Sequence, residues 1–247
     1  PKADDQVDQW RSVMFLYDSA LKKVNTKIEI LNNEFANRYD YNPIEHIKSR
    51  LKSAESIVMK LKKDGYEVTI ENMMECLSDI AGIRIICSFT SDIYQIAGMI
   101  AAQGDVTVLH VKDYIKNPKP NGYKSYHMLV SVPIFLSDSV VDTKVEIQIR
   151  TIAMDFWASL EHKIYYKFEG NAPDYISRDL RECAKMVSEL DEKMLQLNEA
   201  IQECILKESD RERLEGVCRD VIGSREEQKL MSAESAAEDP KKEDQKG

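Results

Sequence analysis

The sequence predicts an α/β fold of the α+β type, in which a mixed β-sheet lies between a long N-terminal helix and a long C-terminal helix. Three observations lead to this prediction. Apolar residues recur every three or four positions towards both ends of the chain, short β-prone runs occupy the middle, and turn residues separate these runs. With 247 residues, 43% of them hydrophobic, the chain can bury one sizeable core.

The first long helix is predicted over 5–36, and a second series with the same period follows Pro173. A helix of this length extends well beyond a small core, at about 1.5 Å per residue, so its outer apolar stripe needs a partner. We therefore expect homo-oligomerisation through the terminal helices. The alternative is that both stripes pack on the chain's own domain. The two stripes are Val7, Trp10, Met14, Tyr17, Leu21, Val24, Ile28, Leu31 and Phe35, and Leu180, Cys183, Val187, Leu190, Met194, Leu197, Ile201 and Cys204.

The middle of the chain predicts strands, because β-prone runs there are bounded by Gly, Asn, Asp or Pro. The link between the third and fourth runs is short enough for a hairpin, which makes the sheet mixed. The expected strands are 83–87, 106–111, 125–132 and 144–150, and the expected helices between them and before them are 43–63, 91–102 and 152–167.

Charge and cysteine content restrict the class of protein. The formal net charge of -9 argues against a protein that coats a polyanion, so any anion site must be local. The five cysteines are scattered and form no CxxC pair, which fits reduced thiols. No long apolar run and no export pattern occur, so we expect a cytoplasmic protein that does not enter a membrane.

Two segments are rich in side chains that suit nucleotides. In the strand 144–150, alternation places Glu146, Gln148 and Arg150 on one face, although this pattern also fits a plain solvated face. The loop 117–127 contains two lysines, two tyrosines and a histidine, which can contact phosphates and nucleobases. An ordinary basic loop is the alternative reading.

Two further segments indicate a binding site only when they are considered together with others. Lys52, Ser56 and Lys60 are four residues apart on one face of the expected helix, where they could clamp a triphosphate or simply face water. Asp79 precedes a small-residue turn, which is a common place for a capping aspartate. To hold Mg²⁺ it would need a second carboxylate, and Glu146 is the candidate.

Taken together, three segments resemble the synthetase domain of RelA/SpoT-type enzymes: Asp79–Arg84, Gly122–His127 and Glu146–Thr151. The resemblance covers roughly 40–170, and the short chain resembles the stand-alone small alarmone synthetases. It implies a nucleotidyltransferase-like sheet, Mg²⁺ as cofactor, and transfer of the β,γ-diphosphate of ATP to the ribose 3′-hydroxyl of GDP or GTP, which makes ppGpp or pppGpp for the stringent response.

The resemblance also implies an organisation of the chain and a homotetramer formed through the flanking helices. The expected parts are an N-terminal oligomerisation helix over 1–40, a catalytic domain over 41–170, a C-terminal helical region over 171–222 and a disordered tail over 223–247. The tail is rich in Glu, Lys, Ser and Ala and lacks apolar periodicity.

The roles of individual residues follow from the same resemblance. Asp79 and Glu146 would hold the metal, and Glu146 would also take the proton from the 3′-hydroxyl. Asp155 stands where one branch of the family has asparagine, and we hypothesise that its carboxylate reads guanine N1–H and N2–H₂. The expected ATP-binding residues are Arg50 and Arg84 on adenine with Lys52, Ser56 and Lys60 on the phosphates, and the expected GDP/GTP-binding residues are Tyr123, stacked on guanine, with Lys119, Lys124, His127, Gln148 and Asp155.

Two other functions remain open at this point. A nucleotidyltransferase that moves a nucleoside monophosphate would also use carboxylates on a sheet, but such enzymes usually place two acids one residue apart after a Gly-Ser turn. An oligomeric module that binds single-stranded RNA would use the basic loop and its tyrosines. The net acidity argues against RNA binding as the sole role, and RNA is kept as a candidate regulator.

Overall fold

The computed structural model describes residues 3–39, 41–167 and 173–237, with side chains for 7–38, 41–164 and 173–208. A five-stranded sheet has the order β1-β2-β5-β4-β3. The central pair β2 and β5 is parallel and the other pairs are antiparallel, which confirms the predicted mixed sheet and the hairpin between β4 and β5. The strands are β1 (Ile44–Leu51), β2 (Ala81–Cys87), β3 (Thr107–Asp113), β4 (Tyr126–Phe135) and β5 (Val140–Thr151).

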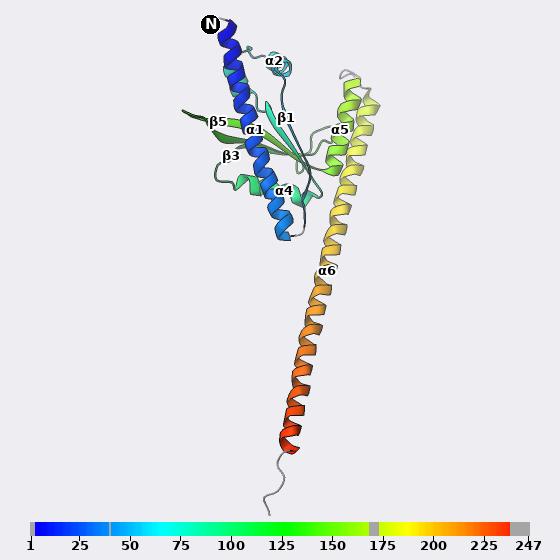
Figure 1. Ribbon diagram of the computed structural model, residues 1–247. Coiled ribbons are helices and arrows are strands. Elements are labelled where there is room, and N and C mark those ends of the chain that lie inside the picture. The colour runs from blue at the N-terminus through cyan, green and yellow to red at the C-terminus, as the bar shows by residue number, and fades with distance from the viewer. Residues whose placement is uncertain (1–2, 40, 168–172, 238–247) are drawn as a thin grey trace, which may run out of the picture. The chain divides into compact units, whose positions relative to one another are not determined.

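Helices pack around this sheet (Figure 1). The predicted N-terminal helix is α1, and most of its apolar stripe, including Tyr17, Val24 and Ile28, is buried in the main core, where the helix contacts β1, β2, β4 and β5. The stripe of α1 therefore packs within the chain, which was the alternative reading for this helix. The helices are α1 (Ala3–Tyr39), α2 (Ala54–Lys63), α3 (Ile70–Cys76), α4 (Thr90–Ala101), α5 (Ile152–Lys167) and α6 (Asp174–Ala237).

The helix expected over 43–63 is wrong in its first half. Residues of β1 pair with β2 in antiparallel register, with Lys48 opposite Arg84 and Arg50 opposite Gly82, so sheet pairing overrides the helical preference of these charged residues. Helix α2 begins only after Ser53, whose side chain accepts a hydrogen bond from Ser56 N and caps the helix. Lys52 therefore precedes the helix instead of lying on it.

The C-terminal part of the chain contains a boundary between two compact units. The chain forms two compact units, Pro1–Leu195 and Gln196–Gly247, so the boundary falls inside helix α6 and inside the expected region 171–222. Helix α6 continues to Ala237, which lies within the expected tail 223–247. The remainder of the expected tail, 238–247, lies outside the described residues. In the second unit, the helix exposes Leu197, Ile201, Ile205 and Leu206.

None of the helices in the described part of the chain is long and apolar enough to cross a membrane.

Candidate active site

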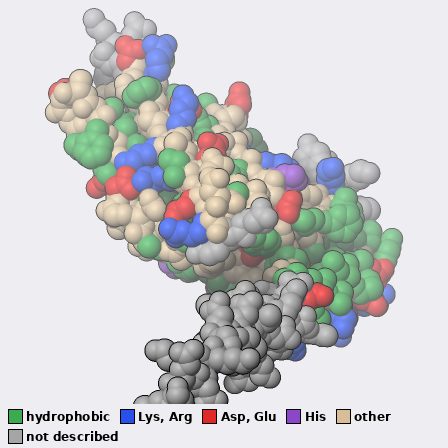
Figure 2. Space-filling view, turned by 60° about the horizontal axis from the view of Figure 1, so that its bottom comes forward, with side chains coloured by type: hydrophobic (Ala, Val, Ile, Leu, Met, Phe, Trp, Pro, Cys, Tyr) green, Lys and Arg blue, Asp and Glu red, His purple; other side chains and the backbone are tan. Residues whose placement is uncertain are grey.

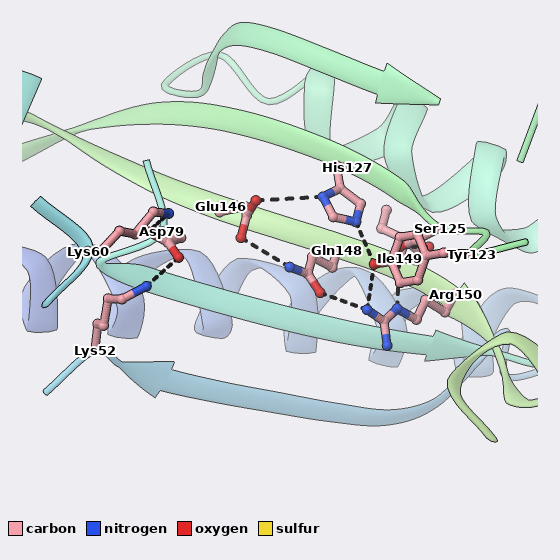
Figure 3. Close-up of polar contacts among 10 residues, drawn as sticks. All are labelled: Lys52, Lys60, Asp79, Tyr123, Ser125, His127, Glu146, Gln148, Ile149 and Arg150. Carbon is pink, nitrogen blue, oxygen red and sulfur yellow. Dashed lines mark hydrogen bonds and ion pairs between the residues drawn. The ribbon is translucent and has the colours of Figure 1, made fainter. Parts of the chain in front are cut away.

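A row of polar side chains follows one face of strand β5. Gln148 Nε2 donates to Glu146 Oε2 at 3.1 Å, and Arg150 Nη2 donates to Gln148 Oε1 at 3.1 Å (Figure 3). The opposite face of the strand carries Val145, Ile147 and Ile149, which are fully buried in the main core. The predicted alternation is therefore confirmed, and the polar face forms a hydrogen-bonded row.

Strand β4 and the loop before it add two aromatic side chains to this row. Tyr123 Oη accepts from Arg150 Nη2 at 2.6 Å and lies 2.8 Å from His127 Nε2. His127 Nδ1 lies 3.6 Å from Glu146 Oε1. The two ring nitrogens of His127 thus face different partners, Nε2 the Tyr123 hydroxyl and Nδ1 the Glu146 carboxylate. The loop thus closes a ring of contacts with β5.

This ring of contacts lowers the pKa of the Glu146 carboxyl. Burial by itself raises the pKa of the Glu146 carboxyl, but the contacts with His127 and the hydrogen bond from Gln148 outweigh burial, so the net pKa is lowered; the Asp79 carboxylate acts in the opposite direction. Glu146 is therefore ionised near neutral pH and can accept a proton.

The second predicted acid, Asp79, lies between α3 and β2 and is bound by two lysines. Lys52 Nζ donates to Asp79 Oδ2 at 2.6 Å, and Lys60 Nζ donates to Oδ1 at 2.8 Å (Figure 3). Burial raises the pKa of this carboxyl, whereas the two lysines lower it by more, so the net pKa is below its ordinary value. The predicted phosphate-binding lysines and the predicted metal ligand are thus in direct contact.

Both acids line one pocket of about 230 Å³ at the surface of the sheet. In Figure 3, Glu146 lies between the Asp79 cluster and the cluster formed by His127, Tyr123 and Arg150. The two carboxylates therefore lie on the same side of the sheet, as the catalytic hypothesis requires. The pocket is lined by Lys48, Ser49, Arg50, Asp79, Gly82, Ile83, Arg84, Glu146 and Gln148.

Guanidinium groups concentrate around this pocket. Arg50 of β1 and Arg84 of β2 both line it, and burial, followed by the positive charges of Arg150 and Arg50, lowers the pKa of Arg84. The buried Nε of Arg84 has no hydrogen-bond partner among the described residues. Clustered cations with an unused donor are typical of a site that receives an anionic ligand.

Asp155, in the first turn of α5, is engaged with two of these arginines. Its Oδ1 accepts from Arg84 Nη1 at 3.4 Å and from Arg150 Nη1 at 3.1 Å. Asp155 thereby connects the arginine of the expected ATP side with the arginine that holds Tyr123. Since both contacts use Oδ1, reading a guanine base would require Oδ2.

Lys119 lies beside the aromatic part of the site. Its ammonium is 4.8 Å from the ring centroid of Tyr123 and 4.9 Å from that of Tyr114. Tyr114 also meets His127 edge-on, with ring centroids 5.2 Å apart. The sequence reasoning missed both Tyr114 and the role of Arg150. The alternation of β5 did contain a signal for Arg150, because it placed this residue on the same face of the strand as Glu146 and Gln148.

Two predicted site residues neither line the pocket nor take part in the side-chain contacts described above. Ser56 belongs to the capping turn of α2, where its hydroxyl accepts a hydrogen bond from the Ser53 hydroxyl at 3.0 Å. Lys124 lines a second, very small pocket beside Trp157 and Ala184. Local capping and packing against α5 and α6 thus place these two side chains away from the other predicted residues.

The donor set at Asp79 and Glu146 fits a divalent cation that arrives with a nucleotide. In the part of the chain that the structure describes, no cluster of three or more His, Cys, Asp or Glu could hold a metal alone. Mg²⁺ in phosphoryl-transfer sites is usually held by only one or two carboxylates, together with substrate phosphates and water. Two carboxylates on one pocket meet this requirement.

Comparisons with known proteins agree with this geometry. A family model described as "Region found in RelA / SpoT proteins" matches residues 49–171. The GTP pyrophosphokinase YwaC of Bacillus subtilis (strain 168) is 48% identical over 195 residues, which cover 79% of this chain and 93% of that protein.

Solved structures give the same result. The small alarmone synthetase 2 of Bacillus subtilis has a TM-score of 0.70 and 47% identity, covering 77% of this chain and 98% of that one. The small alarmone synthetase 1 of the same organism, bound to its product pppGpp, has a TM-score of 0.72 and 34% identity, covering 78% and 98%. With a shared sheet, a matching domain and this level of identity, the chain belongs to the RelA/SpoT family.

Proposed function

We propose that this protein transfers the β,γ-diphosphate of ATP to the ribose 3′-hydroxyl of GDP or GTP and so makes ppGpp or pppGpp. The observation that carries the proposal is that Asp79 and Glu146 line one pocket, with Lys52 and Lys60 at one end and the Tyr123–Arg150 pair at the other. The relative YwaC is a GTP pyrophosphokinase, and small alarmone synthetase 1 binds its product pppGpp, which supports the same reaction for this chain.

Glu146 is the general base of the proposed reaction. Its ionised carboxylate takes the proton of the 3′-hydroxyl while the oxygen forms a bond to the β-phosphorus of ATP. The bond from this phosphorus to the oxygen bridging the α- and β-phosphates then breaks, and AMP leaves. A positioned carboxylate base contributes about 10²–10⁴-fold in rate. Gln148 and His127 hold the carboxylate in place.

Asp79 and Glu146 would hold Mg²⁺. When bound, this ion offsets the negative charge of the ATP phosphates and of the departing AMP. Lys52 and Lys60 contact Asp79 through their ammonium groups and are long enough to exchange this carboxylate for phosphate oxygens. The donor site thus contains cations that can change partner when ATP arrives.

The bases are proposed to lie on either side of this centre. Arg50 and Arg84 flank the adenine, since a guanidinium both stacks on a ring and stays charged. Tyr123 stacks on the guanine, a contact worth roughly 1–3 kcal/mol. Lys119 and His127, next to Tyr123, serve the acceptor phosphates, and Gln148 and Oδ2 of Asp155 are left to contact the acceptor nucleoside.

The assembly is proposed to be a homotetramer held by α5 and α6. Figure 2 shows a broad group of hydrophobic side chains on the side of the molecule where these two helices lie in Figure 1. Such a contiguous apolar area is typical of an interaction surface. The exposed apolar residues of these helices in the first unit include Ile152, Phe156, Leu160, Tyr175, Met186, Leu190 and Met194.

A product assay tests the proposed reaction. The protein is incubated with labelled ATP, GDP and Mg²⁺, and we expect AMP together with a 3′-diphosphorylated guanosine nucleotide. Release of inorganic pyrophosphate instead of AMP would indicate the nucleotidyltransferase alternative. Retention of single-stranded RNA without turnover would indicate the RNA-binding alternative. A cytoplasmic location is proposed because these nucleotide substrates and the scattered free cysteines suit that compartment.

A further inference from the structure

Helix α6 reaches the candidate site through the loop that carries Tyr123. Gly122 has a backbone φ of +91°, and a Cβ placed on it would lie 2.5 Å from the Cβ of Ala184 on α6. The loop therefore approaches α6 more closely than any other residue type would allow. Tyr123 itself packs against a small cluster formed by Trp157, Ala158 and Ala184.

Helix α6 also holds the end of the strand that carries the polar row. Thr151, the last residue of β5, is fully buried, and its hydroxyl donates to Oδ2 of Asp191 on α6 at 2.7 Å. The same hydroxyl accepts from Met154 N at 3.1 Å and so caps α5. Asp191 is only 8% exposed, and because burying a carboxylate is costly unless it is hydrogen-bonded or paired, the hydrogen bond from Thr151 offsets part of this cost.

These two attachments meet at one pair of side chains. Gly122 directly precedes Tyr123, Thr151 directly follows Arg150, and Tyr123 and Arg150 are joined by the hydrogen bond of 2.6 Å. Helix α6 therefore contacts Gly122 on one side of this pair and the Thr151 side chain on the other. A displacement of α6 relative to β5 would move the tyrosine ring with respect to Glu146.

We propose that Asp191 is a positioning residue for the acceptor nucleotide: by holding Thr151 against α6, it sets the place of the Tyr123–Arg150 pair on which the guanine stacks. This inference rests on the proposed function, because it takes Tyr123 as the acceptor platform. Asp191 touches neither substrate nor reacting atoms. It acts through Thr151, together with the close contact between Gly122 and Ala184.

The test compares Asp191→Ala with Asp191→Asn and with Glu192→Ala. The asparagine oxygen can still accept from Thr151, and Glu192 is an exposed acid on the same helix, so these two variants are the matched controls. GDP binding is measured by calorimetry without ATP or metal, and the KM values for GDP and ATP are measured separately by AMP release.

We expect Asp191→Ala to weaken GDP binding and raise the GDP KM by roughly fivefold, the size of a lost buried hydrogen bond, with the ATP KM within about twofold of wild type. Asp191→Asn and Glu192→Ala are expected to match wild type within about twofold. If Asp191→Ala does not fold, Thr151→Val, which keeps the shape and removes the hydroxyl, is expected to show the same selective loss.

Unchanged GDP affinity in a folded Asp191→Ala or Thr151→Val variant would overturn the inference, as would an equal loss of GDP and ATP binding. The proposed function is tested separately: it fails if the wild-type protein forms no AMP from ATP and GDP. In that case the calorimetric GDP affinities of the variants still test the role of Asp191. A wild-type protein that does not bind GDP would overturn both.

Discussion

The donor half and the acceptor half of the candidate site are built in different ways. The donor half uses Lys52 and Lys60, which come from the segment after the edge strand β1 and from α2, and which share Asp79. The acceptor half uses side chains of the central strand β5, its neighbour β4 and the loop before β4, joined from Glu146 to Tyr123 by hydrogen bonds. The Arg150 side chain is only 6% exposed, whereas Lys60 is 35% exposed.

This difference has a physical meaning. Buried polar groups must keep their hydrogen bonds, so the acceptor half is a network whose members depend on one another. Partly exposed ion pairs contribute little to stability, so Lys60, the more exposed of the two lysines in the donor half, can exchange partners at small cost. We therefore infer that the acceptor half is pre-arranged and that the donor half rearranges when ATP binds.

The largest expected effect comes from the residue between the two halves. Glu146→Gln should lower kcat by about 10²–10⁴-fold, because the amide cannot accept the proton of the 3′-hydroxyl. The substitution keeps the shape of the side chain, so ATP and GDP affinities should stay within about threefold. Single-turnover formation of AMP and calorimetric binding of each nucleotide measure the two quantities. A variant with wild-type turnover would remove Glu146 from the role of base.

Lys60→Met tests whether the donor half acts locally. We expect the ATP KM to rise by about tenfold, the lower range for loss of a hydrogen bond to a charged group, with the GDP KM unchanged. Lys63→Met is the control, since Lys63 is exposed in the last turn of the same helix. An equal rise of both KM values would show that the two halves are coupled and that the donor half does not act locally.

The sequence predicted the acceptor half better than the donor half, and the reason is physical. Strand β5 is buried on one face, so its alternation of apolar and polar residues is strict and places Glu146, Gln148 and Arg150 together. Strand β1 lies at the sheet edge and is largely exposed, so its sequence lacks alternation, and its charged residues favoured a helix over 43–63.

Contacts made by packing of distant elements were beyond prediction. Asp191 and Thr151 are 40 residues apart, and their pairing depends on how α6 packs against β5 and α5. The same packing places Lys124 beside Ala184, although its position next to Tyr123 predicted a phosphate contact. A residue's neighbours in sequence do not specify which of several adjacent elements its side chain meets.

Asp155→Ala tests how Asp155 connects the two halves through Arg84 and Arg150, and its expected effect on the KM values is intermediate in size. We expect the acceptor KM to rise by about fivefold, for the loss of one hydrogen-bonding group to guanine, and the ATP KM to rise by about twofold, because Arg84 loses its ion pair. Kinetics with GDP varied at saturating ATP, and the reverse, provide both values. Equal changes would mean that Asp155 only orders the two arginines and does not read the base.

The smallest expected effect concerns stability and pH in the donor half. In the wild-type protein the lysines hold the pKa of Asp79 below its ordinary value of 3.8, so their contribution to the free energy of unfolding is present above that pH and is lost as pH falls through the lowered pKa.

Lys52→Met removes one of these lysines. The pKa of the buried Asp79 carboxyl is then higher than in the wild-type protein, so this carboxyl becomes protonated at a higher pH. The variant should therefore be less stable than wild type by about 1 kcal/mol at pH 7, and this difference should shrink as pH falls below about 4. Urea unfolding followed by circular dichroism, at pH 7 and at roughly pH 5 and pH 3.5, measures this difference in the free energy of unfolding. A difference that stays constant with pH would mean that Lys52 stabilises the fold through its aliphatic chain and not through Asp79, and the donor half would then be as fixed as the acceptor half.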